Sequence, residues 1–140
     1  MKIERKKILI FLLVLTLAFI WGNSLLDAEH SSTGSGRVVE FLEVFFGEGN
    51  VSEHLVRKLA HFSEFALLGA ELMLLFEKLP LAAAHGLFAA VTDEALQLLS
   101  DRSGEVKDIL LDFSGSVCGA AFILIILLIL RKADKNGQKN

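Results

Sequence analysis

Hydrophobic residues form four long runs along the chain, and polar residues gather between these runs and at both ends. The runs cover residues 8–26, 59–79, 81–99 and 112–130. A helix of about 20 residues is about 30 Å long, which matches the hydrocarbon thickness of a bilayer. The pattern therefore predicts an all-α protein, a bundle of four transmembrane helices.

The first run has a second interpretation, because a basic start followed by an apolar stretch is also typical of a signal peptide. No small-residue cleavage site follows this run, which ends in Trp21, Gly22, Asn23 and Ser24. We therefore expect an uncleaved membrane anchor.

A soluble helical bundle is an alternative for the whole chain, since polar residues recur on one face of the second and third runs. It does not explain residues 8–20 and 121–130, which are apolar on every side. Two such segments are hard to bury inside so small a protein. The sequence thus favours a membrane protein.

Basic residues predict the orientation of the helices. Four of them precede the first run and four follow the last: Lys2, Arg5, Lys6, Lys7, Arg131, Lys132, Lys135 and Lys139. Cytoplasmic flanks of membrane proteins carry an excess of Lys and Arg. We therefore expect a multi-pass plasma-membrane protein with both termini cytoplasmic, as an even number of spans requires.

Composition and charge narrow the class of protein further. The chain has 140 residues, of which 53% are hydrophobic and 22% charged, and this length allows one domain. We distinguish an N-terminal flank with the first helix (1–26), an outer loop (27–56), a three-helix core (57–130) and a cytoplasmic tail (131–140). The net charge of −3 argues against nucleic acid as a partner. The single Cys118 excludes an internal disulfide and a Cys-based zinc finger.

The outer loop contains a short amphipathic segment. Between residues 38 and 46, apolar side chains alternate with Glu40 and Glu43. This segment is too short to span a bilayer and is typical of a helix that lies on a membrane surface. It would act either as a packed connector or as a lid over the bundle. The next helix is expected to begin near Ser52 as its N-cap.

Polar residues that interrupt the last three runs are expected to meet at the outer end of the bundle. The start of the second helix, the end of the third and the start of the fourth should lie at one depth. The nine residues of this predicted polar cluster are Lys58, His61, Glu64, Asp93, Glu94, Gln97, Arg102, Asp108 and Asp112. Ionisable groups at membrane depth normally face a bundle interior or a wet cavity, which makes them candidates for function.

Members of the polar cluster have more than one interpretation. His61 and Glu64 are a hydrogen-bonded pair that fixes helix packing, a catalytic or ligand-contacting pair, or part of a metal site. Arg102 is either a rim residue that reaches toward water or a clamp for a phosphate or carboxylate. The spacing His-x-x-Glu is a weak indication of a metal, and we expect neither a metal nor another cofactor.

Three short sequence blocks contain most of the polar cluster. Residues 58–65 are KLAHFSEF, residues 92–97 are TDEALQ, and residues 102–108 are RSGEVKD. In the same order they resemble the K-x-x-H-F-x-E-[YF], [ST]-D-E-x-x-Q and R-x-G-x-x-x-D motifs of the VanZ-like family of bacterial integral membrane proteins. Asp112 with Gly115 resembles the start of the last helix of that family. The resemblance implies a bacterial plasma membrane and a link to resistance against teicoplanin, a glycopeptide antibiotic that carries a lipid chain.

Three functions are consistent with these features. The first is a protein without enzymatic activity that binds a lipid-linked or amphiphilic envelope ligand, with the polar head of the ligand at the cluster. The second is a small intramembrane enzyme for a lipid-linked envelope substrate, with His61 beside Glu64, Asp93 or Asp112. The third is a proton or ion pathway, which would require a homo-oligomer because four helices are few for a transporter. We favour the first.

Overall fold

Four long helices follow one another along the chain. The computed structural model describes residues 3–25, 38–41, 43–44, 49, 52–99 and 105–137. The long helices of these residues are α1 (Ile3–Ser24), α3 (Glu53–Phe76), α4 (Leu79–Leu99) and α5 (Val106–Gly137). No β-strand occurs in the described ranges, and the predicted all-α class is confirmed.

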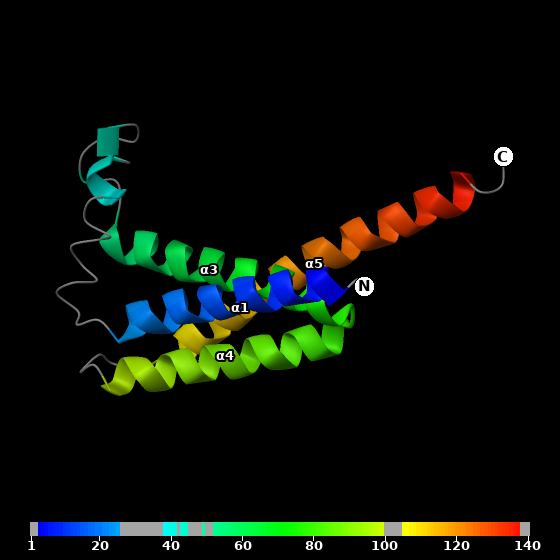
Figure 1. Ribbon diagram of the computed structural model, residues 1–140. Coiled ribbons are helices and arrows are strands. Elements are labelled where there is room, and N and C mark those ends of the chain that lie inside the picture. Colours follow the sequence, from blue (N-terminus) through cyan, green and yellow to red (C-terminus); the bar gives the residue numbers. More distant parts are fainter. Residues whose placement is uncertain are drawn as a thin grey trace.

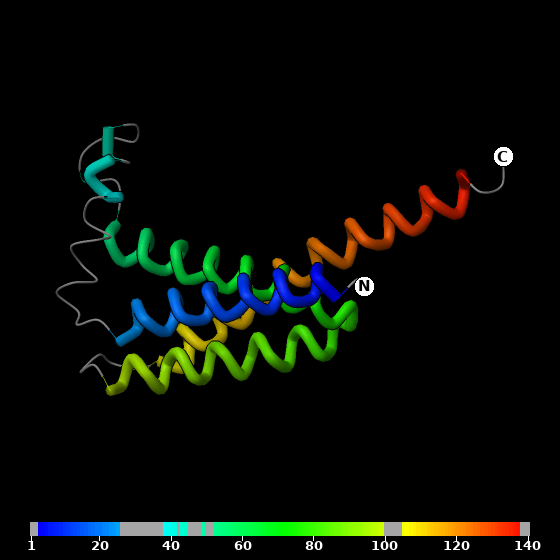
Figure 2. The backbone as a smooth tube through the Cα atoms, in the orientation of Figure 1, coloured from blue at the N-terminus to red at the C-terminus, as the bar shows by residue number. Residues whose placement is uncertain are grey.

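Successive long helices run in opposite directions, so that both termini lie toward one end of the bundle (Figure 1). α3 packs most extensively against α5 and also contacts α1 and α4, while α4 contacts α1 and α5 as well. The C-terminal part of α5 extends beyond the other helices, as the backbone trace shows (Figure 2). At the other end of the bundle, the start of α3, the end of α4 and the start of α5 come together.

The turn between α3 and α4 is short and locally stabilised. Glu77 takes a left-handed backbone conformation with φ 52°, and its N–H donates to the carbonyl oxygen of Met73 at 2.9 Å. Pro80 stands in the first turn of α4, where a missing N–H breaks no helical hydrogen bond. Arg131 of α5 forms an ion pair with Glu77 at 2.7 Å, so this turn is also tied to the last helix.

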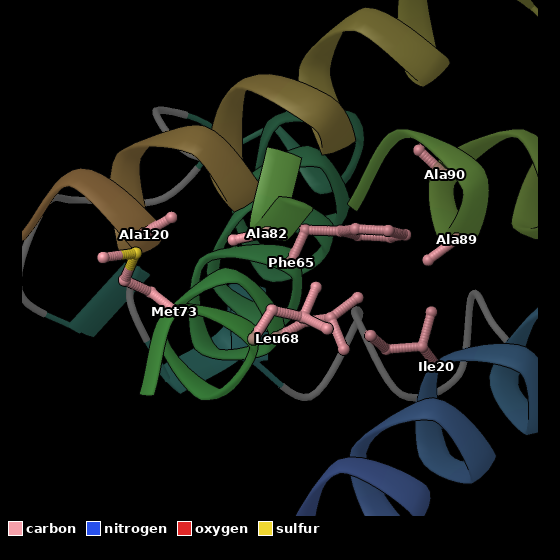
Figure 3. Close-up of a cluster of buried hydrophobic side chains, with 9 residues drawn as sticks. Ile20, Phe65, Leu68, Met73, Ala82, Ala89, Ala90 and Ala120 are labelled. Atoms are coloured by element: carbon pink, nitrogen blue, oxygen red, sulfur yellow. The ribbon is translucent and has the colours of Figure 1, made fainter. Parts of the chain in front are cut away.

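Side chains of all four helices form the apolar core (Figure 3). Ile20 of α1 and Phe65 and Leu68 of α3 are fully buried, and they pack with small residues of α4 such as Ala82 and Ala90. Alanine side chains allow helix backbones to approach closely, which is the usual way in which helices pack where lipid surrounds them. The core is therefore narrow, and polar groups lie close to it.

Glycines allow α3 and α5 to pack closely against each other. A Cβ atom on Gly115 would overlap the backbone carbonyl of Phe62, and one on Gly119 would overlap that of Ala66. Small residues four apart are a known device for close packing of membrane helices. The register of α5 against α3, and hence the height of Asp112 relative to His61, depends on these two glycines.

Three helices, α1, α3 and α5, are long and apolar enough to cross a membrane, as judged over the described residues. α4 is not among them, and His85, Asp93, Glu94 and Gln97 interrupt its apolar residues. Large apolar side chains are exposed along the helices, and they include Phe11 and Phe19 of α1. These features make the chain a helical membrane protein, and the prediction of a fourth span, 81–99, stays a prediction.

The boundaries of the predicted segments differ in places from those observed. α5 begins at Val106 rather than at residue 112 and continues through Arg131 to Gly137, so most of the predicted tail is helical. Ala, Lys and Arg favour helix, and the side chains of residues 131–137 are exposed. α1 similarly begins at Ile3 within the predicted basic flank.

The region before α3 is described only in part. Ser52 occupies the predicted N-cap position with an extended backbone, although its side chain makes no capping hydrogen bond. Residues 38–41 and 43–44 of the predicted amphipathic segment are helical, and residues 26–37 and 45–48 lie outside the described ranges. Its position on a membrane surface stays a prediction.

Candidate functional site

Three helices bring one histidine and two aspartates together near one end of the bundle. His61 of α3 places Nδ1 3.9 Å from Oδ2 of Asp93 on α4 and 4.0 Å from Oδ1 of Asp112 on α5. The side chains of Asp93 and Asp112 are 0% and 2% exposed, whereas that of His61 is 17% exposed. We call these residues the buried triad. His61 is the member that links the triad to the surface.

Asp93 is held by hydrogen bonds from two different helices. The Ser24 hydroxyl of α1 donates to Oδ1 at 2.5 Å, and the Gln97 side-chain amide donates to Oδ2 at 2.8 Å. Hydrogen bonds to a charged carboxylate are stronger than neutral ones. The carboxylate of Asp93 is therefore fixed in position, and through Ser24 all four long helices contribute to the site.

Asp112 is buried without comparable hydrogen bonds. Its Oδ1 atom has no hydrogen-bond partner among the residues that the structure describes, and the residue is 1% exposed. Burial of a polar group without a partner costs about 1–3 kcal/mol, and more for a charged group. The fold therefore tolerates an unsatisfied carboxyl oxygen directed at His61, which is uncommon in a structure shaped for stability alone.

Further carboxylates surround Asp112. Glu64, Asp93, Glu94 and Asp108 each lie close enough to interact electrostatically with it. Within the described ranges, no Lys or Arg forms an ion pair with Asp93 or Asp112. The interior of the site is therefore strongly acidic.

Lys58 and Asp108 form an ion pair at the edge of the site. The Lys58 ammonium lies 3.0 Å from Oδ1 of Asp108, and each side chain is 31% exposed. Lys58 precedes His61 by one turn on α3, and Asp108 precedes Asp112 by one turn on α5. The pair therefore marks the boundary between the buried triad and the solvent-exposed end of the bundle.

Glu94 connects α4 to the beginning of α5. Its Oε1 atom accepts a hydrogen bond from the backbone N–H of Glu105 at 2.5 Å, next to the first residue of α5. Backbone N–H groups at the start of a helix have no helical partner. Glu94 thus satisfies one of them and fixes the start of the helix that carries Asp112.

The structure brings together eight of the nine residues predicted for the polar cluster. Glu64 is half-buried one turn from His61 and interacts electrostatically with Asp93. Arg102 lies outside the described residues, so its assignment as a rim residue or an anion clamp stays a prediction. The predicted convergence of three helices is observed.

Ser24 is a residue of the site that the hydropathy pattern does not indicate. It stands at the end of the first apolar run, and α1 is apolar on nearly every side. The run Gly22-Asn23-Ser24 at the end of α1 was the available signal, since a polar residue at that end can reach the end of α4.

One comparison with known proteins gave a match. A family model described as VanZ/LLP1 matches residues 9–129, which include all four long helices in whole or in large part. Comparisons with curated proteins and with solved structures found no match. The matched range contains every member of the polar cluster.

Proposed function

The chain belongs to the VanZ/LLP1 family and is a membrane protein of that family. We propose that it binds a lipid-linked or amphiphilic ligand of the bacterial envelope. The polar head of the ligand contacts the polar cluster, and its acyl part lies along the apolar helices. The observation that carries this proposal is the acidic cluster that α3, α4 and α5 assemble at one end of an apolar bundle.

The surface next to the cluster suits a ligand of mixed character. Leu59 of α3, Leu98 and Leu99 of α4, and Val106 and Leu110 of α5 are exposed within about two turns of the buried triad. A bound amphiphile therefore meets carboxylates and apolar side chains within the span of one small molecule. Exposed apolar patches bordered by polar groups are typical of binding sites.

The charge of the cluster indicates which head groups it would bind. Carboxylates accept hydrogen bonds from hydroxyl, amide and ammonium groups, whereas Lys58 is already paired with Asp108. We therefore propose a head rich in hydrogen-bond donors, such as the sugar and peptide parts of an acylated glycopeptide or of a lipid-linked cell-wall precursor. Teicoplanin combines a glycopeptide with a lipid chain. We therefore propose that the protein binds teicoplanin and that this binding is linked to resistance.

The predicted orientation in the membrane would give the cluster access from outside the cell. Both termini lie toward the end of the bundle away from the cluster (Figure 1), and both are flanked by basic residues. If these flanks are cytoplasmic, as the positive-inside rule predicts, the polar cluster faces the outer leaflet. This is the side on which an envelope ligand arrives.

An enzymatic function is the second candidate, favoured by a histidine that lies between two aspartates. A general base must lie within about 2.6–3.2 Å of the substrate proton that it abstracts, or reach it through one water. His61 lies 3.9 and 4.0 Å from the two aspartates, which would orient its imidazole ring. Binding is the first candidate because it rests on the whole polar cluster and on the apolar surface beside it.

Direct binding tests the proposal. Purified protein in lipid nanodiscs is titrated with teicoplanin, with a glycopeptide that lacks an acyl chain, and with a lipid-linked cell-wall precursor. We expect saturable binding of at least one acylated compound, at least tenfold weaker binding of the compound without the chain, and at least a tenfold loss for Asp93→Asn. Glu77→Gln, at the other end of α3, is the matched control and should bind as wild type.

Two results would overturn the proposal. One is the absence of saturable binding for both acylated compounds. The other is equal affinity of wild type, Asp93→Asn and Glu77→Gln, which would show that binding occurs away from the cluster.

A further inference from the structure

We propose that the buried triad of His61, Asp93 and Asp112 binds a divalent transition-metal ion, Zn²⁺ or Mn²⁺. This goes beyond the proposed ligand binding and departs from the expectation, drawn from the sequence, that the protein has no metal. It rests on the arrangement of donor atoms, on an unsatisfied carboxyl oxygen and on the charge of the site.

The donor atoms are close enough to share one ion. One imidazole nitrogen and one oxygen from each carboxylate all lie within 4.8 Å of one another. Around a tetrahedral zinc ion with bonds of about 2.0–2.1 Å, neighbouring ligand atoms are about 3.3 Å apart. The observed separations of 3.9 and 4.0 Å from His61 Nδ1 exceed this value by about 0.6–0.7 Å. The separation between the two carboxylate oxygens is at most 4.8 Å, so binding requires shifts of about 1 Å, which side-chain rotation supplies.

The chemistry of the three donor side chains restricts which metal ion binds to the buried triad. Zn²⁺ binds both imidazole and carboxylate, and Mn²⁺ favours carboxylate. Ca²⁺ and Mg²⁺ prefer sites made of oxygen atoms alone. Three protein ligands leave at least one coordination position for water or for a ligand, and the partial exposure of His61 places the opening of the site toward the surface.

Asp112 provides an independent indication of a missing partner. Its Oδ1 atom is buried, has no hydrogen-bond partner in the described part of the chain, and is directed at His61. A bound cation would supply the interaction that this oxygen lacks. The same cation would offset the repulsion that Asp112 experiences from Glu64, Asp93, Glu94 and Asp108.

The surroundings of Asp93 resemble the support that metal ligands usually have. Carboxylates that bind metals are themselves held by hydrogen bonds, and loss of such bonds weakens metal affinity about 10- to 100-fold. Ser24 and Gln97 donate to the two oxygens of Asp93. Each of these oxygens keeps a second lone pair, so Asp93 can accept both hydrogen bonds and still bind an ion.

Metal titration of the purified protein tests the inference. Protein in detergent is stripped with a chelator, dialysed and titrated with Zn²⁺ and, separately, with Mn²⁺ by calorimetry, and the bound metal is counted by mass spectrometry. We expect one ion per chain for at least one of the two metals. Affinity should fall at least tenfold in Asp112→Asn and in His61→Ala.

Two variants serve as matched controls. Glu71→Gln changes a buried carboxylate about 15 Å along α3 from His61, where the amide can still accept the hydrogen bond that Thr16 donates. His54→Ala removes an exposed imidazole of the same helix. Both should keep the stoichiometry and affinity of wild type, which separates the triad from adventitious binding.

The outcome is readable even if a variant is less stable. Asp112→Asn keeps the shape of the side chain and leaves no acid beside the surrounding carboxylates, so it should fold. Zn²⁺ or Mn²⁺ should raise the Tm of wild type but not of this variant. Failure of wild type to bind either metal, or equal binding by Asp112→Asn and Glu71→Gln, would overturn the inference. Binding of the amphiphilic ligand in the presence of chelator reports on the proposed function separately.

Discussion

Asp93 shows how single residues of the site serve both stability and function. It is fully buried, it accepts hydrogen bonds from α1 and from its own helix, and it is one of the two carboxylates nearest His61. A buried carboxylate that is fixed this well costs desolvation energy, which its hydrogen bonds offset only when all of them are made. Removal of a single donor should therefore be measurable.

The Ser24→Ala variant tests the contribution of one such donor. Loss of a hydrogen bond to a buried carboxylate should lower the free energy of unfolding by about 1.5–3 kcal/mol. Ser114→Ala is the control, because the Ser114 hydroxyl is exposed and donates only to the Leu111 carbonyl of its own helix; its effect should stay within about 0.5 kcal/mol. Thermal unfolding in detergent, followed by circular dichroism, measures both. Equal stability of the two variants would contradict the role given to Ser24.

The ion pair between Lys58 and Asp108 should behave differently. Both side chains are about one-third exposed, and pairs of this kind contribute about 0–1 kcal/mol. A double-mutant cycle with Lys58→Gln and Asp108→Asn is therefore expected to give a coupling free energy below about 1 kcal/mol. A coupling above about 2 kcal/mol would show that the pair is part of the buried framework and not of its rim.

At the scale of helices, the interface between α3 and α5 determines whether the site can form. The polar residues of these two helices meet because Gly115 and Gly119 let the backbones approach at Phe62 and Ala66. Any side chain at these positions would displace α5 from α3 and move Asp112 relative to His61. Packing and site geometry are thus coupled through two residues that carry no chemistry themselves.

Gly119→Ala tests this coupling. The added methyl group overlaps the Ala66 carbonyl, and such overpacking costs about 1–3 kcal/mol. Cys118→Ala changes the neighbouring, exposed position and should be nearly neutral. Thermal stability in detergent is the first measurement, and the affinity for the acylated ligand is the second. A Gly119→Ala protein with the stability of Cys118→Ala would mean that α5 does not pack on α3 through this glycine.

The sequence predicted the helices better than it predicted their ends and rotations. Long apolar runs are sufficient to predict α1, α3 and α5, whereas the end of α5 depends on how far a charged helix continues into water. The polar residues of α3, α4 and α5 were predictable because alternating helix directions place them at one depth. The role of Ser24 was not predictable, because α1 is apolar all round and its pattern does not show which face packs inward. In the structure, only Leu9, Ile20 and Ser24 of that helix are buried.

For the whole molecule, the central question is which side of the membrane the cluster faces. The arrangement of the helices places both termini opposite the cluster (Figure 1), and termini on one side require an even number of spans. The prediction that α4 is a fourth span agrees with this arrangement. Its polar residues Asp93, Glu94 and Gln97 are buried, which would keep them away from lipid.

Labelling of single cysteines tests this topology. In a Cys118→Ala background, Ser35→Cys in the outer loop should react with a membrane-impermeant maleimide in intact cells. Lys135→Cys, near the end of α5, should react only after the membrane is permeabilised. Equal labelling of both positions before permeabilisation, or the reverse pattern, would contradict the proposed orientation.

Crosslinking of a photoreactive acylated ligand would locate the binding site most directly. Protein in membranes is irradiated with a photoreactive teicoplanin derivative, with and without an excess of unlabelled teicoplanin, and the modified peptides are identified by mass spectrometry. We expect competable crosslinks within residues 55–65, 93–99 and 105–112, the three segments that surround the buried triad. Competable crosslinks confined to the other end of the bundle, or labelling that the excess does not reduce, would contradict the account.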